Sequence, residues 1–77
     1  MDTRGRLPED EMEQQELFEK MKLAIDREYE AYLLYKDIAE NSGEPELRII
    51  FDRIASEEYQ HREIILKRYK ILKGLTD

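Results

Sequence analysis

The sequence contains no cysteine, only three glycines and two prolines, and no long run of apolar residues. Without cysteine the chain forms neither disulfides nor a thiolate metal site, and it has no cysteine-based electron-transfer centre. Its apolar runs are far too short for a membrane span, and the N-terminus lacks the apolar core of a secretory signal. We therefore expect a soluble, cytoplasmic protein that does not insert into membranes.

Positive charge is also scarce, because 13 basic residues stand against 19 acidic ones and the net charge is −6. This balance opposes binding to nucleic acid phosphates unless a basic face is concentrated somewhere. The only candidate is a basic stretch near the C-terminus, which comprises Arg62, Lys67, Arg68, Lys70 and Lys73. Cations at that place also complement the dipole at a helix C-terminus. We favour this structural explanation and expect no nucleic acid partner.

The few glycines and prolines mark the ends of two predicted helices. Pro8 is followed by acidic residues, which is typical of a helix start. Helical periodicity then runs to about Glu40, and Gly43 can take the left-handed conformation that ends a helix. A second helix is predicted to start at Pro45 and to stop before Gly74.

The segment between the two predicted helices is so short that the helices must run antiparallel. The expected organisation is a flexible N-terminal tail over residues 1–8, a helical hairpin over residues 9–74 and a C-terminal tail over residues 75–77. Two helices in a chain of 77 residues cannot bury enough apolar surface to be comfortably stable alone. We therefore expect the hairpin to self-associate.

One apolar face of each predicted helix carries residues that could bind a metal. Positions spaced alternately four and three residues apart lie on one face of a helix. In the first helix this face holds Leu17, Met21, Ala24, Glu28, Ala31, Tyr35 and Ile38, and in the second it holds Leu47, Phe51, Ile54, Glu58, His61, Ile65 and Leu72. Burying an ionised carboxylate or an unpaired imidazole costs several kcal/mol, so we expect a metal ion to compensate.

The positions of the polar residues indicate a di-metal site. Glu58 and His61 are three residues apart and can reach a common ion, while Glu28 is expected at the height of Glu58 because Gly43 lies midway between them. A di-metal site in a four-helix bundle takes one Glu from each of two helices and a Glu-x-x-His from each of the other two. This hairpin supplies one of each, so two copies would complete the bundle and the site. Oxygen and imidazole ligands suit iron or manganese, with zinc as a substitute.

Residues 23–72 resemble the ferritin-like di-iron hairpin of rubrerythrins and of encapsulated ferritins, which build their site across a dimer. The resemblance rests on Glu28 followed seven residues later by Tyr35, on the Pro-Glu-Leu start of the second helix, and on the sequence SEEYQH with Glu58 and His61. It implies an all-α fold, an antiparallel two-helix hairpin that dimerises into a ferritin-like four-helix bundle. The dimers could associate further into a ring.

By position, the resemblance implies that Glu28 is a terminal or chelating ligand, that Glu58 bridges the two ions, and that His61 is the nitrogen ligand. The implied cofactor is iron, with two ions per dimer. Tyr35 would donate a hydrogen bond to a ligand carboxylate; the alternative is an aromatic core residue with its hydroxyl at the rim. The other tyrosines lie off this face and are expected to pack at its flanks or between dimers: Tyr29, Tyr32, Tyr59 and Tyr69.

The predicted function is that of a ferroxidase, which oxidises Fe(II) with dioxygen or peroxide at a site shared by two protomers. The protein would work in the cytoplasm or as the cargo of an encapsulating shell protein, inside a nanocompartment. The sequence lacks the rubredoxin-like cysteine site of rubrerythrins, so a peroxide-reducing protein with an external electron donor is an alternative. A non-catalytic structural or adaptor four-helix bundle, in which the buried polar residues set the register, is a further alternative.

Overall fold

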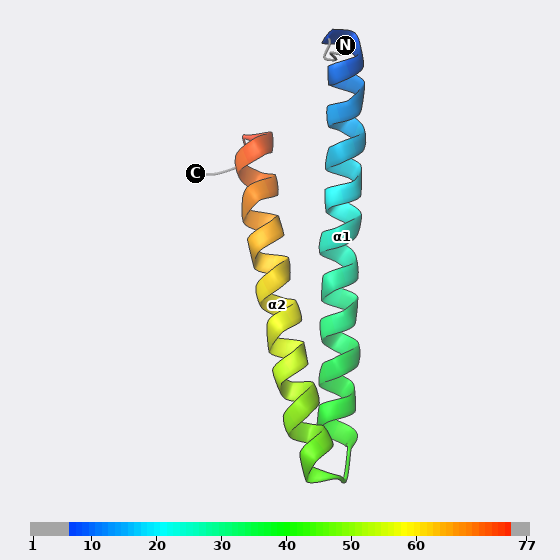
Figure 1. Ribbon diagram of the computed structural model, residues 1–77, viewed down its shortest axis with the longest axis vertical. Coiled ribbons are helices and arrows are strands. Elements are labelled where there is room, and N and C mark those ends of the chain that lie inside the picture. Colours follow the sequence, from blue (N-terminus) through cyan, green and yellow to red (C-terminus); the bar gives the residue numbers. More distant parts are fainter. Residues whose placement is uncertain (1–6, 75–77) are drawn as a thin grey trace.

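The computed structural model describes the backbone of residues 7–74 and the side chains of residues 13–74, and it consists of two α-helices (Figure 1). Helix α1 spans Leu7–Asn41 and helix α2 spans Pro45–Lys73. The two helices run antiparallel, and the N-terminal part of α1 extends beyond the C-terminal end of α2 (Figure 1). The predicted all-α hairpin is therefore confirmed.

The helix boundaries agree closely with the sequence prediction. Helix α1 begins one residue before Pro8, and α2 has the predicted bounds. Gly74 follows α2 in a left-handed conformation with a φ of 72°, and its N–H donates to the carbonyl of Ile71. Only glycine takes this backbone conformation at no steric cost, which explains why α2 ends there. The predicted tails, apart from the first residues of α1, lie outside the described residues.

The end of α1 differs from the prediction, because Gly43 does not have a positive φ. The side-chain amide of Asn41 instead donates to the carbonyl of Asp37 at 2.9 Å. In the connection between the helices, the Ser42 hydroxyl accepts a hydrogen bond from the N–H of Glu44 at 3.0 Å. These polar side chains provide hydrogen-bond partners for the Asp37 carbonyl and the Glu44 N–H. A glycine in the left-handed conformation is therefore not needed to end α1.

Glu44 caps the start of α2, since its carboxylate accepts a hydrogen bond from the N–H of Leu47 at 2.8 Å. We expect Glu44→Ala to lower the free energy of unfolding by about 1 kcal/mol, because one N–H of the first turn loses its partner. Glu44→Ser should keep most of the stability, because serine is a strong N-cap residue. Urea denaturation of the two variants measures the difference, and equal stability of both would contradict this role of Glu44.

The helices contact each other along a narrow strip. Ile25, Ala39 and Ala55 are the buried apolar residues among those described, with exposed fractions of 6%, 2% and 1%. The alanines allow the two backbones to approach closely, and tight contact of this kind is what holds helix pairs together. The core of the hairpin therefore consists of a few small side chains between α1 and α2.

None of these three buried residues lies on the apolar faces identified in the sequence. Ile25 precedes Glu28 by three residues, which is a rotation of about 60° on a helix with 3.6 residues per turn. Ala55 stands in the same relation to Glu58. The predicted faces themselves are half-buried or exposed, and Leu17 and Leu72 are 50% and 52% exposed. Within one hairpin the helices therefore meet through the neighbouring faces and leave these faces partly uncovered.

The hairpin is a single layer of helices. Its shortest extent is 14 Å, which is little more than the diameter of about 10–12 Å of one helix with its side chains. Nothing within the described chain covers the faces that carry Glu28 and Glu58, although both are rich in apolar residues. We call the half-buried part of this surface on α1 and α2 the open face; it includes Ala24, Ala31, Ile54 and Ile65.

Candidate metal centre

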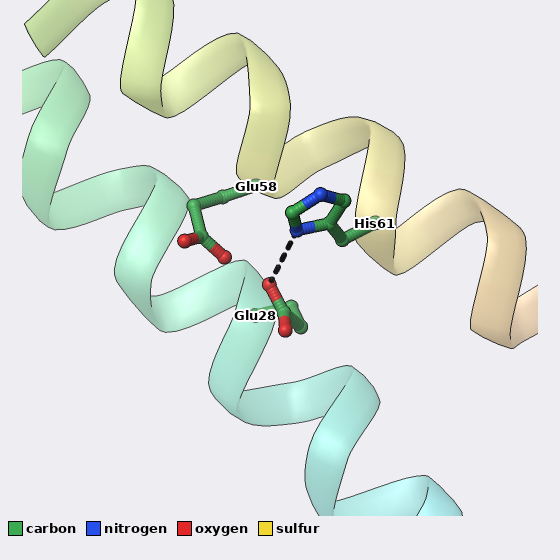
Figure 2. Close-up of side chains that lie close together, drawn as sticks. All are labelled: Glu28, Glu58 and His61. Atoms are coloured by element: carbon green, nitrogen blue, oxygen red, sulfur yellow. Dashed lines mark ion pairs between the residues drawn. The ribbon is translucent and has the colours of Figure 1, made fainter.

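The three predicted ligands come together near the middle of the hairpin (Figure 2). Glu28 extends from α1, and Glu58 and His61 extend from successive turns of α2. One ligand atom of each residue lies within 4.8 Å of those of the other two. The expected common height of Glu28 and Glu58 is thus correct, and within the described part of the chain no other group of acidic residues and histidine is arranged in this way.

The distances leave room for an ion between the side chains. His61 Nδ1 lies 4.0 Å from Glu28 Oε1, which is too long for a hydrogen bond. Glu28 Oε1 is buried and has no hydrogen-bond partner. A divalent ion such as zinc binds nitrogen and carboxylate oxygen at about 2.0–2.2 Å, so two donors about 4 Å apart can share one ion. The residues present therefore fit a metal, and the ion would supply the missing partner of Glu28.

The two carboxylates influence each other strongly. The hydrogen bond with Glu28 is the main cause that raises the pKa of Glu58 above its ordinary value of 4.5; burial and the negative charge of Glu28 add to it, while His61 opposes it. Two ionised carboxylates have no donor between them, so this hydrogen bond requires a proton on Glu58. Below the raised pKa a proton on Glu58 would join the two carboxylates, and a bound cation would replace it.

This raised pKa predicts how the stability of the metal-free protein depends on pH. The folded state favours protonated Glu58, so its contribution is complete below pH 4.5 and is lost as the pH rises through the raised pKa. Glu58→Gln keeps a donor at every pH and should therefore remove part of this loss, whereas Glu57→Gln, on an exposed neighbour, should not. Urea denaturation over this pH range in the presence of a chelator tests the prediction, and parallel curves for all three proteins would contradict it.

The centre is open on one side. The Glu28 side chain is 27% exposed and the His61 side chain is 58% exposed in the single hairpin, so the burial expected of the ligands in a four-helix bundle stays a prediction. One chain also brings only three ligating side chains together, fewer than the four that close a structural zinc site. A single hairpin therefore gathers three candidate ligands on a surface that solvent can reach.

The comparison with protein-family models matches residues 9–77 of this chain to the rubrerythrin family. The chain belongs to the rubrerythrin family. Rubrerythrins are part of the ferritin-like superfamily and typically bind iron, which agrees with the carboxylate and imidazole donors gathered here. Searches of curated proteins and of solved structures gave no significant match. Within residues 7–74, this rubrerythrin-family hairpin has no helix that is both long and apolar enough to cross a membrane.

Tyr35 of this rubrerythrin-family chain is half-buried, and its ring lies against Phe51 with the ring centres 5.8 Å apart. Among the described hydrogen bonds, none joins its hydroxyl to Glu28 or Glu58. Tyr35 lies about two helical turns beyond Glu28 on the same face. Its role as a hydrogen-bond donor to a ligand carboxylate stays a prediction, and its ring serves the contact between the helices.

The sequence analysis missed an aromatic cluster that lies at the height of the candidate ligands but on another side of the helices. The rings of Tyr29 and Tyr32 are stacked with centres 5.8 Å apart, and those of Tyr32 and Tyr59 are 5.2 Å apart. The guanidinium of Arg62 lies 5.0 Å from the centre of the Tyr29 ring and 5.9 Å from that of Tyr59. The available signal was that Tyr29 and Tyr59 each directly follow a candidate ligand, which places them at the same height. We call these four residues the tyrosine cluster.

Proposed function

We propose that two copies of this chain pair through their open faces and form a di-iron site at which Fe(II) is oxidised. The supporting observation is the position of Glu28, Glu58 and His61, which are gathered in one place but left half open on the face that no part of the hairpin covers. A second copy would bring the other half of a ligand set of this type. The same contact would bury the apolar side chains that a single layer leaves exposed.

In this function iron is the substrate and the side chains provide its binding geometry. Glu28 and His61 would each bind one ion, and Glu58 would bridge the two ions. Two Fe(II) ions give up one electron each, so together with two protons they reduce dioxygen to hydrogen peroxide, or hydrogen peroxide to two water molecules. The Fe(III) products then leave the site. The uptake of protons in both reactions fits a centre whose carboxylates exchange a proton for a cation.

The test is an anaerobic titration of the metal-free protein with Fe(II), followed by sedimentation velocity and then by admission of air or peroxide. We expect Fe(II) to drive or tighten dimerisation, with about two ions per dimer, and the ferric absorbance to rise rapidly once the oxidant is added. Parallel assays with dioxygen and peroxide identify the oxidant. A dimer that neither binds Fe(II) nor changes on its addition would refute the proposal. The encapsulating shell and the cytoplasmic location stay predictions.

A structural four-helix bundle is the second candidate, and one observation favours it. The hydrogen bond with Glu28 that raises the pKa of Glu58 would partly satisfy these side chains without any metal, as a buried polar pair that fixes the register would require. This function predicts that the triple variant Glu28→Leu, Glu58→Leu and His61→Leu stays dimeric and that iron does not affect the assembly of the wild-type protein. Iron-dependent assembly that is lost in the triple variant would exclude it.

A further inference from the structure

One hairpin by itself gathers three possible ligands for a single ion. The ligand atoms of Glu28, Glu58 and His61 all lie within 4.8 Å of one another, and no second chain is needed to bring them together (Figure 2). An ion such as zinc binds these donors at about 2.0–2.2 Å, so donors that share it lie at most about 4.4 Å apart. His61 is 58% exposed and has room for the small rotation that this requires. The unpaired hairpin can therefore hold an ion with three protein ligands.

The charges of this group also suit one ion per chain. Two ionised carboxylates carry two negative charges, which one divalent cation balances, and a neutral imidazole adds none. Glu28 Oε1 is buried without a hydrogen-bond partner, so it can turn to a cation without giving up another contact. Two ions in one hairpin would have to share three side chains and would leave two positive charges uncompensated. One ion therefore fits the ligands of one chain better than two.

The open face is the side from which an ion reaches these ligands. On that side the Glu28 and His61 side chains are in contact with solvent. The neighbouring side is closed by the contact between the helices, where Ala55 is only 1% exposed, and the tyrosine cluster lies beyond that contact. In the proposed dimer a second copy covers the open face and removes this direct route. An ion that binds before pairing does not meet this obstacle.

Pairing of two empty hairpins has an electrostatic cost as well. The proposed contact brings Glu28 and Glu58 close to the same two residues of the second copy, so four carboxylates meet within an apolar surface. Burying ionised carboxylates without a compensating charge costs several kcal/mol. An ion already bound to each hairpin balances this charge, and burial of the apolar side chains can then drive pairing.

We propose that each hairpin binds one divalent ion through its own Glu28, Glu58 and His61 before it pairs, so that the loaded monomer is the species that forms the dimer. This inference rests on the proposed function, because it takes pairing through the open faces as given. It assigns the order of assembly, and each copy then brings one ion to the shared site. Its direct consequence is that a hairpin that cannot pair still binds one ion.

The experiment uses zinc, which binds the same types of donor as Fe(II) and is not oxidised. Pairing is blocked with the double variant Leu47→Lys and Leu72→Lys. Both leucines lie on the same apolar side of α2 as Glu58, they are 41% and 52% exposed, and each stands 11 residues, or about 16 Å, from the nearest candidate ligand. Sedimentation velocity measures the mass of the variant, and calorimetry counts the bound ions. We expect one zinc ion per monomer.

The chain has a single histidine, which shows directly where the ion binds. In the variant labelled with nitrogen-15, nuclear magnetic resonance follows both imidazole nitrogens, and we expect zinc to shift the signal of His61 Nδ1, the nitrogen that faces Glu28. Adding Glu28→Ala or His61→Ala should raise the dissociation constant for zinc at least about 100-fold, since changes even to residues that only orient metal ligands cost 10–100-fold. Glu57→Ala, on an exposed neighbour of Glu58, is the control and should leave it unchanged.

The wild-type protein provides a second arm, in which the chain concentration is varied across the dissociation of the dimer. A zinc affinity that levels off at low concentration, with one ion on each monomer, supports the inference. Zinc binding that disappears together with the dimer overturns it. If the lysine variant still dimerises, dilution of the wild-type protein decides between the same two results.

The outcomes separate this inference from the proposed function. If the wild-type protein binds neither zinc nor Fe(II) at any concentration, both fail together. If the wild-type dimer binds two ions while the monomer binds none, only the inference is overturned. If the monomer binds one zinc ion and loading promotes pairing, but Fe(II) is not oxidised, the proposed function fails and the inference stands.

Discussion

Replacing Glu58 with alanine is expected to lower the rate of Fe(II) oxidation at least about 100-fold, since changes even to residues that only orient metal ligands cost 10–100-fold. Glu58 is gathered with Glu28 and His61 and is the carboxylate that would contact both ions. At a pH above the raised pKa of Glu58 both carboxylates are ionised and repel each other, and the substitution removes this repulsion. We therefore expect the metal-free variant to keep its helical circular dichroism and to be at least as stable as the wild type.

Glu57→Ala is the matched control for this variant. Glu57 is the exposed neighbour of Glu58 on α2, so the two variants lose the same charge and differ only in the face of the helix that is altered. Stopped-flow measurement of ferric absorbance after mixing with dioxygen or peroxide compares the two proteins. Wild-type rates in Glu57→Ala and a near-total loss in Glu58→Ala would support the centre. Rapid oxidation by both would refute the assignment of Glu58 as a ligand.

Making the open face polar is expected to dissociate the dimer. Ile54 and Ile65 flank Glu58 and His61 on α2, and both are only half-buried in the hairpin. The double variant Ile54→Gln and Ile65→Gln places four altered side chains in each dimer. Full burial of an isoleucine contributes about 1.5–3 kcal/mol, and roughly half of this would come from the dimer contact, so the dissociation constant should rise by at least about 100-fold. Because each hairpin holds only part of the site, Fe(II) oxidation should fall together with dimerisation.

The control for this double variant carries two isoleucine-to-glutamine substitutions on another side of α2. Ile49 and Ile64 are 61% and 67% exposed, and their positions in α2 point away from the open face. Ile49→Gln with Ile64→Gln should leave both the sedimentation coefficient and the oxidation rate of the wild type. A dimer that survives the changes at Ile54 and Ile65 but is lost in the control would place the interface elsewhere and contradict the proposed pairing.

Local features of the sequence were sufficient to predict the helical hairpin. Pro45 and Gly74 set the bounds of α2 because a proline at the first turn and a left-handed glycine after the last one act on the backbone directly. The common height of Glu28 and Glu58 followed from equal chain lengths on both sides of a short connection and a fixed rise per residue. Gly43 shows the limit of such rules, because the side chains of Asn41 and Ser42 took over the role expected of a backbone conformation.

The sequence by itself determined the two helices, their antiparallel order and the three ligand candidates, because each depends on residue type, periodicity or chain length. Only the tertiary structure decided which face of each helix meets the other. Ile25, Ala39 and Ala55 form that contact, and a pattern of apolar residues does not distinguish this face from one rotated by about 60°. The same rotation leaves Glu28, Glu58 and His61 partly exposed, since their exposure depends on how closely two particular helix surfaces pack.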